Sequence, residues 1–191
     1  RQYLNRLVQK GYKVAIAEQM EDPKLAKGIV KREVIRIVTP GTNMSQAILD
    51  ETRNNYLMCI FGCNDEYGVA VCDITTGEFR SCHISSTSKL YDEINKYSPT
   101  EIIGNEVFLS CVLNFDYMKE KMKITISEAP SHYFNDDTCE DFIKRQFKVG
   151  SIDGLGIDEQ EDMLLSAGAL LQYLHCLLYT SPSPRDGLLS R

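Results

Sequence analysis

Asp73 is the carboxylate best placed to do chemistry, because it lies at the end of the predicted strand that contains the apolar run Val69–Cys72. Two-metal cleavage of a phosphodiester requires three or four converging carboxylates that hold the ions about 4 Å apart. Glu101 and Asp158 qualify as companions by residue type alone. The alternative is that Asp73 caps the turn at residues 75–77, and the sequence favours this structural role.

A second candidate chemistry is the binding of an anion such as the phosphate backbone of DNA. The basic side chains that could contact it are Lys27, Lys31, Arg32 and Arg36. Residues 30–39 are rich in β-branched side chains and predict a strand, in which Arg32 and Arg36 share one face and Lys31 points the other way.

Arg32 is our first choice for this contact, because a guanidinium stays charged and donates two parallel hydrogen bonds to one phosphate. Lys27 and Lys31 are weaker candidates. Arg36 competes with Arg32 but could equally be an ion-pair partner of Glu18 or Glu33. For the segment as a whole, the alternative is a solvated strand edge whose lysines oppose aggregation.

Several other chemistries lack their signatures. Gly154-Leu155-Gly156 has no following Lys-Ser/Thr, so it does not form a nucleotide phosphate loop. The 3 histidines are scattered, and the 7 cysteines have no regular spacing. We therefore expect no metal ion, no catalytic residue, and mostly buried thiols in a reducing, cytoplasmic setting.

Charge divides the 191 residues unevenly. Residues 1–41 contain 9 basic and 4 acidic side chains, whereas the whole chain has a net charge of −6, so residues 42–191 carry −11. The contrast suggests two domains with different partners, although a fluctuation in surface charge is an equal alternative. No apolar run is long enough for a membrane span, and we expect no membrane contact. A helical pattern already begins at Leu4, which predicts that the chain is part of a longer protein.

The predicted elements alternate between strands and helices. Residues 2–10 form a helix, 13–18 and 30–39 are strands, and the polar residues 42–54 are a linker. Residues 56–84 predict a three-stranded antiparallel meander. The later helices are expected over 86–97, 107–113, 137–147 and 158–178, with strands at 101–104 and 123–128. This mixed α/β order is typical of a ribonuclease-H-like fold.

Several blocks of the sequence, in order, resemble the MutS family of bacterial DNA mismatch-repair proteins. They begin with Lys13-Val-Ala-Ile-Ala-Glu-Gln19 and Val34-Ile-Arg-Ile-Val-Thr-Pro-Gly-Thr42, and continue with Asp73-Ile-Thr-Thr-Gly-Glu-Phe79, Ser98-Pro-Thr-Glu-Ile-Ile103 and Ala167-Gly-Ala-Leu-Leu-Gln-Tyr173. The resemblance extends to about Leu174. It implies that residues 1–41 are the C-terminal part of a small α+β mismatch-recognition domain and that residues 55–178 are a non-catalytic, ribonuclease-H-like connector domain. Residues 179–191, with two prolines in a serine-rich run, look non-native, and the alternative is a native Pro/Ser linker.

The resemblance also implies binding partners, cofactors and a location in the cell. Members of the family bind mismatched double-stranded DNA as homodimers and have MutL as a partner protein. They use ATP and Mg²⁺ at a site that this sequence lacks. The Phe-x-Glu motif that contacts the mispaired base is absent as well. The expected location is the bacterial cytoplasm, on the nucleoid. Asp141 and Phe142 match family positions near the MutL interface, while Ile143 and Phe147 are expected to face the core. The alternative for this helix is that it is an ordinary amphipathic helix without a partner.

Overall fold

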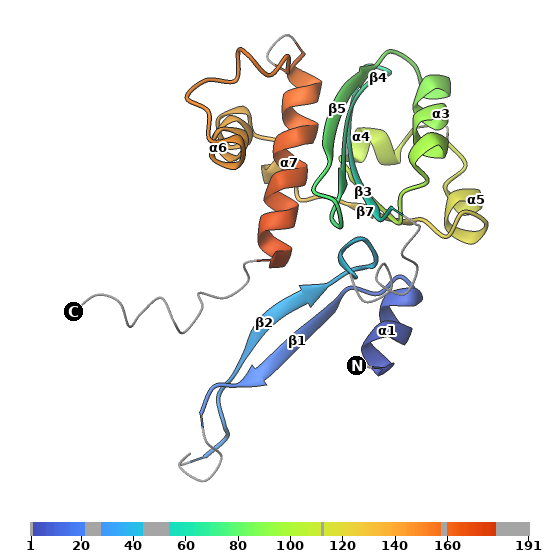
Figure 1. The fold of residues 1–191 in the computed structure, drawn as a ribbon. Helices are drawn as coiled ribbons and strands as arrows, with labels where there is room; N and C mark the ends of the chain where they lie inside the picture. Colours follow the sequence, from blue (N-terminus) through green and yellow to red (C-terminus); the bar gives the residue numbers. More distant parts are fainter. Residues whose placement is uncertain (1, 22–27, 44–53, 112, 158–159, 179–191) are drawn as a thin grey trace.

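The computed structural model describes residues 2–21, 28–43, 54–111, 113–157 and 160–178 (Figure 1). A short helix and a two-stranded antiparallel sheet come first: α1 (Gln2–Gln9), β1 (Val14–Gln19) and β2 (Arg32–Val38). The helix ends as predicted beside Gly11, whose φ of 86° is the left-handed conformation that glycine adopts readily. A single 3-10 turn, η1 (Pro40–Thr42), follows β2 and leads toward the main sheet.

The main sheet has five strands in the order β5-β4-β3-β6-β7. Their bounds are β3 (Tyr56–Cys63), β4 (Glu66–Asp73), β5 (Phe79–Ile84), β6 (Glu101–Gly104) and β7 (Thr125–Glu128). The first three form the predicted antiparallel meander, and β6 and β7 extend it as parallel strands. The predicted mixed α/β, ribonuclease-H-like arrangement is therefore confirmed.

Helices cover both faces of this sheet (Figure 1). One face carries α3 (Thr87–Tyr97), α4 (Glu106–Leu109) and α5 (Phe115–Glu120), and the other carries α6 (Asp136–Phe147) and α7 (Glu161–Leu178). Successive β3 side chains alternate between the two cores: Met58 and Ile60 pack with the first group, and Leu57 and Cys59 with the second. Burial on both faces explains why β3 is apolar throughout.

Helix α7 is apolar on most sides because it lies between the sheet and α6. Two glycines allow α7 to approach α6 and β4 closely. A Cβ on Gly168 would lie 2.2 Å from the Cβ of Cys139 on α6, and one on Gly68 would lie 1.8 Å from the carbonyl oxygen of Asp162. Despite its apolar surface, neither α7 nor any other helix in the described ranges is long and apolar enough to cross a membrane.

Some element predictions were inaccurate. The helix expected over 107–113 is the single turn α4, and α5 was not predicted, because helices this short have almost no apolar periodicity. Phe147 was expected to face the core, but the residue is 42% exposed, and its ring makes a T-shaped contact with that of Phe79. Thr42 and Asn43, assigned to the linker, are buried. Residues 44–53 and the predicted tail 179–191 lie outside the described residues.

All seven cysteines are free thiols. Cys59, Cys72 and Cys139 are buried, and burial raises the pKa of Cys72 to about 11 and that of Cys139 to about 12. These thiols stay protonated and unreactive at neutral pH. Cys63 and Cys176 are exposed.

Candidate functional site

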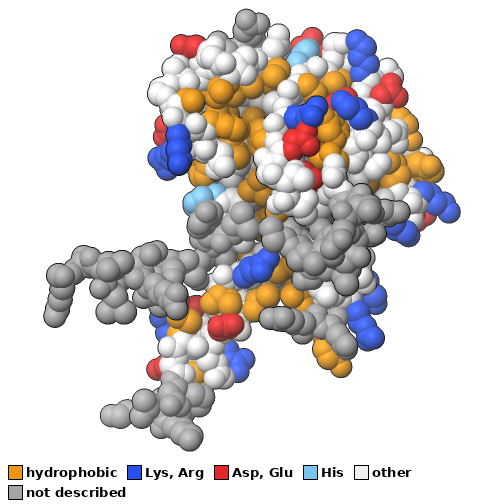
Figure 2. All heavy atoms as spheres, in the orientation of Figure 1, with side chains coloured by type: hydrophobic (Ala, Val, Ile, Leu, Met, Phe, Trp, Pro, Cys, Tyr) orange, Lys and Arg blue, Asp and Glu red, His pale blue; other side chains and the backbone are white. Residues whose placement is uncertain are grey.

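Two of the candidate DNA-contacting side chains, Arg32 and Arg36, lie on β2, and Lys31 directly precedes it; β2 leaves the body of the molecule together with β1 (Figure 1). Arg32, Val34 and Arg36 are exposed and alternate with half-buried neighbours, so the two arginines share a face as predicted. In Figure 2 the basic side chains in this lower part of the molecule are separated by hydrophobic ones. A strand face that carries two exposed arginines can follow a phosphate backbone.

Lys31 already has a partner. Its Nζ lies 2.6 Å from Glu33 Oε1, and its backbone N–H donates to Glu21 Oε1 at 2.8 Å. The hydrogen bond and charge of Glu33 raise the pKa of Lys31. Both side chains are well exposed, so this pair weakens but does not cancel the attraction of Lys31 for a phosphate. Lys27 lies outside the described residues.

The alternative role of Arg36, an ion pair with Glu18 or Glu33, is not observed among the described residues. Arg36 is opposite Ile16 on β1, Glu18 is opposite Glu33, and a register shift separates the two pairs. Among the described residues, no ion pair joins Arg36 to Glu18 or to Glu33. Arg32 is opposite Gln19 at the end of the ladder furthest from η1. Both arginines therefore stay candidates for backbone contacts.

Asp73 caps the turn that follows β4. Its Oδ1 accepts hydrogen bonds from the Thr75 N–H at 2.9 Å and from the Thr75 hydroxyl at 2.5 Å, and its carbonyl accepts from the Gly77 N–H at 2.8 Å. Burial raises the pKa of Asp73, but hydrogen bonds from Thr75, followed by Thr76 and Asn55, together outweigh it and hold the pKa below the ordinary value. The structural role that the sequence favoured is confirmed.

The nuclease alternative finds no support. Within the ranges that the structure describes, no three His, Cys, Asp or Glu side chains are grouped closely enough to hold a metal ion. Glu101, one proposed companion of Asp73, is fully engaged elsewhere. Asp158, the other, lies outside the described residues.

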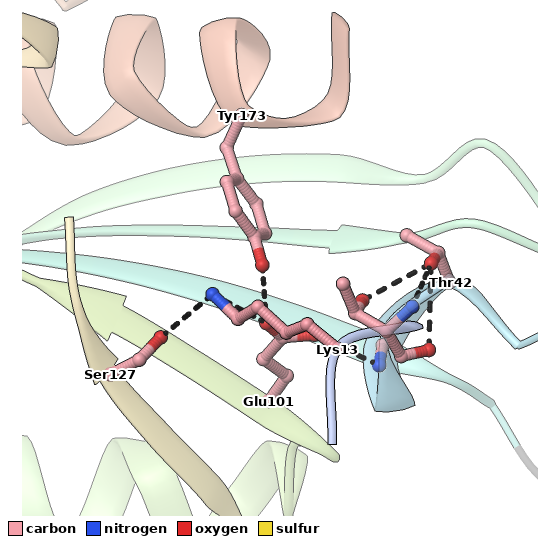
Figure 3. Close-up of polar contacts among 7 residues, drawn as sticks. Lys13, Thr42, Glu101, Ser127 and Tyr173 are labelled. Carbon is pink, nitrogen blue, oxygen red and sulfur yellow. Dashed lines mark hydrogen bonds and ion pairs between the residues drawn. The ribbon is translucent and has the colours of Figure 1, made fainter. Parts of the chain in front are cut away.

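Glu101 instead lies at the junction between the first unit and the main sheet (Figure 3). The carboxylate is 0% exposed. Its Oε2 accepts from the Gly41 N–H at 3.0 Å, its Oε1 accepts from the Tyr173 hydroxyl at 2.5 Å, and Lys13 Nζ lies 3.8 Å from Oε1. One carboxylate therefore joins β6, the η1 turn, the residue before β1, and α7.

The groups around Glu101 are themselves held in place. Lys13 Nζ donates to Ser127 Oγ on β7 at 3.2 Å and lies 4.9 Å from the centroid of the Tyr173 ring. Burial, followed by the charge of Glu101, raises the pKa of Tyr173, so its hydroxyl remains a hydrogen-bond donor. Asn55 Nδ2 donates to the Gly41 carbonyl at 2.9 Å. Sequence reasoning missed this site, and the available signal was an acidic residue at the start of an otherwise apolar strand.

The candidate partner-binding residues lie on α6. Asp141 is exposed, and its Oδ2 is 3.7 Å from Arg145 Nη2 one turn later. Phe142 is half-buried against the core, and its ring meets that of His175 on α7 at 5.5 Å. Ile143 faces the core as predicted. Asp141 is thus accessible to a partner, whereas Phe142 mainly joins α6 to α7.

Comparisons with known proteins agree with this architecture. The family model described as MutS domain I matches residues 1–47, and that described as MutS domain II matches residues 55–183. The DNA mismatch repair protein MutS of Lachnoclostridium phytofermentans is 49% identical over 173 residues, which are 91% of this chain and 19% of that protein. The MutS proteins of Acetivibrio thermocellus and Methanococcoides burtonii are 45% and 38% identical, and each match covers 90% of this chain and 20% of the relative. The chain spans about a fifth of the length of these relatives, and it belongs to the MutS family.

Proposed function

We propose that this chain acts in DNA mismatch repair, as the part of a MutS protein that contacts the DNA backbone and connects that contact to the rest of the molecule. The observation that carries the proposal is the junction at Glu101. It ties the unit that presents Arg32 and Arg36 to the five-stranded sheet and to α7.

The DNA contact in this proposal is a positioning contact. Arg32 and Arg36, with Lys31 and Lys27 as weaker contributors, would bind phosphates without distinguishing base pairs. Selection of mismatched double-stranded DNA would belong to the whole protein. The related proteins are named for mismatch repair, which supports this assignment.

The remaining activities are proposed for the whole protein. ATP and Mg²⁺ would bind in segments outside this chain, which would itself have no catalytic role. The exposed Asp141 side of α6 would contact MutL, the protein would act as a homodimer, and it would work on the nucleoid in the bacterial cytoplasm.

A chimera tests this function directly. Residues 1–178 would replace the matching segment of the Lachnoclostridium phytofermentans protein, which is 49% identical. The chimera would be introduced into a bacterial strain that lacks MutS, beside the unaltered parent protein and an empty vector. We expect it to lower the mutation rate to about that of the parent. A chimera that is folded and abundant but leaves the mutation rate at the empty-vector level would contradict the proposal.

A further inference from the structure

Glu101 and Asp73 are the acidic side chains that the described part of the chain buries. Asp73 bonds within its own turn, whereas Glu101 bonds to groups far away in sequence: Gly41 is 60 residues before it and Tyr173 is 72 residues after it. Oε2 accepts from the first unit at Gly41, whereas Oε1 accepts from Tyr173 on α7 and also faces Lys13 of the first unit at 3.8 Å. The Glu101 carboxylate thus links these two parts, next to Lys13 of the first unit, whose Nζ lies over the Tyr173 ring of α7 (Figure 3).

The contacts on Glu101 differ in strength. A buried carboxylate is costly unless donors surround it. The Gly41 N–H and the Tyr173 O–H are within ordinary hydrogen-bond distance, while Lys13 is 3.8 Å away and 39% exposed. Charge-assisted bonds to the two neutral donors should therefore determine the geometry, with Lys13 supplying a weaker, screened attraction.

The surroundings of Gly41 show how closely the η1 turn approaches Glu101. A Cβ at this position would lie 2.9 Å from Glu101 Oε2 and 3.0 Å from Leu57 Cδ1. The η1 turn is also braced from within, because the Thr39 N–H donates to Thr42 Oγ1 at 2.9 Å. The turn thus meets Glu101 as a preformed unit with its amide already directed at the carboxylate.

We propose that Glu101 is a positioning residue that holds the unit α1–η1 in one orientation relative to α7, so that a displacement of either is transmitted to the other. That this coupling serves mismatch recognition rests on the proposed function. The positioning role itself depends only on the contacts above.

The first test measures the junction in this chain through hydrogen exchange of the Gly41 amide. Glu101→Gln keeps the size of the side chain but removes the charge. Tyr173→Phe removes one donor and leaves the carboxylate, so it covers the case in which the glutamine variant fails to fold. We expect each to speed Gly41 exchange about tenfold while the β3 and β4 amides stay unchanged. Glu128→Gln, an exposed acid on neighbouring β7, is the control and should have no effect.

The double variant separates positioning from general stability. If Tyr173 acts on Gly41 through Glu101, adding Tyr173→Phe to Glu101→Gln should produce little further change. Additive effects, unchanged Gly41 exchange, or equal acceleration of all β3 and β4 amides would overturn the proposal.

The second test uses the chimera and compares its affinities for mismatched and matched DNA. We expect Glu101→Gln to lower the ratio of the two affinities about fivefold while the salt dependence of matched-DNA binding stays the same. An unchanged ratio would overturn the role in recognition. A parent chimera that binds no DNA would contradict the proposed function instead, and the exchange result would still decide the positioning role.

Discussion

The His83 ring on β5 lies against the Asp162 carboxylate in the first turn of α7, with 2.6 Å between Nδ1 and Oδ2. The two residues are 79 positions apart, and their side chains are 25% and 11% exposed. Nearby, Ser81 Oγ donates to the Met163 carbonyl at 3.4 Å, and Gly68 allows the helix to touch β4. The start of α7 is therefore attached to the meander by polar contacts, while its later turns are attached by apolar packing.

We predict that His83 and Asp162 are coupled by about 1 kcal/mol. The measurement is a double-mutant cycle of His83→Asn and Asp162→Asn in urea unfolding at pH 7. Asparagine at position 162 keeps an oxygen for the Met163 N–H, which Asp162 Oδ1 accepts at 2.9 Å. Additive free energies for the two changes would show that the contact does not stabilise the fold.

Gly168→Ala should destabilise the chain by about 2–3 kcal/mol, because the new methyl group meets the Cys139 backbone and side chain and forces α6 away from α7. The matched control is Gly150→Ala, since a Cβ there has no neighbour within 4 Å. The control should change stability by less than about 0.5 kcal/mol. Equal effects of both changes in chemical denaturation would contradict the tight α6–α7 packing.

Asp73→Ala should cost about 1–3 kcal/mol at pH 7 by removing the acceptor for Thr75. The native carboxyl has a lowered pKa, so its contribution is present above its ordinary pKa of 3.8 and is lost as the pH falls through the lower native value. The stability difference between wild type and variant should therefore shrink below about pH 4 in a series of unfolding curves.

The same Asp73 variant tests the nuclease alternative. In the chimera it should leave DNA binding unchanged once the loss of stability is allowed for. Mg²⁺-dependent cleavage of DNA or RNA that disappears in this variant would show that Asp73 is catalytic after all.

Arg32→Ala in the chimera should weaken binding to matched and mismatched DNA to a similar degree, because a phosphate contact carries no sequence information. The slope of log affinity against log salt should fall by about one unit. Lys31→Ala should lower the slope less, since Glu33 already pairs with Lys31. An unchanged slope for Arg32→Ala would remove this residue from the interface, and a loss limited to mismatched DNA would make it a specificity residue.

Asp141→Lys should weaken the recruitment of MutL by the chimera while leaving mismatch binding intact, because the side chain is exposed and its only described ion pair is the long one to Arg145. Recruitment would be measured as MutL bound to mismatched DNA in the presence of the chimera. Asp116→Lys on α5, across the sheet from α6, is the control for a simple change of net charge. Equal recruitment by wild type and Asp141→Lys would exclude this side chain from the contact.

Local patterns in the sequence were enough for most of the architecture. The β-branched run over residues 30–39 and the pattern of residues 56–84 specify nearby backbone geometry, and the predicted strand and antiparallel meander are both confirmed. The turn-capping role of Asp73 was predictable for the same reason, since its partner Thr75 is two residues away. The ordered blocks of family resemblance added the identity of both units.

Contacts between distant residues were decided only by the tertiary structure. The role of Glu101, the need for glycine at positions 41 and 168, and the pairing of His83 with Asp162 all depend on segments that meet after the sheet has formed. Periodicity indicates which face of an element is buried, but it does not say which group lies opposite. For a buried carboxylate that missing information is decisive, because its donors determine whether it would bind a metal, cap a turn or, as Glu101 does, join two parts of the chain.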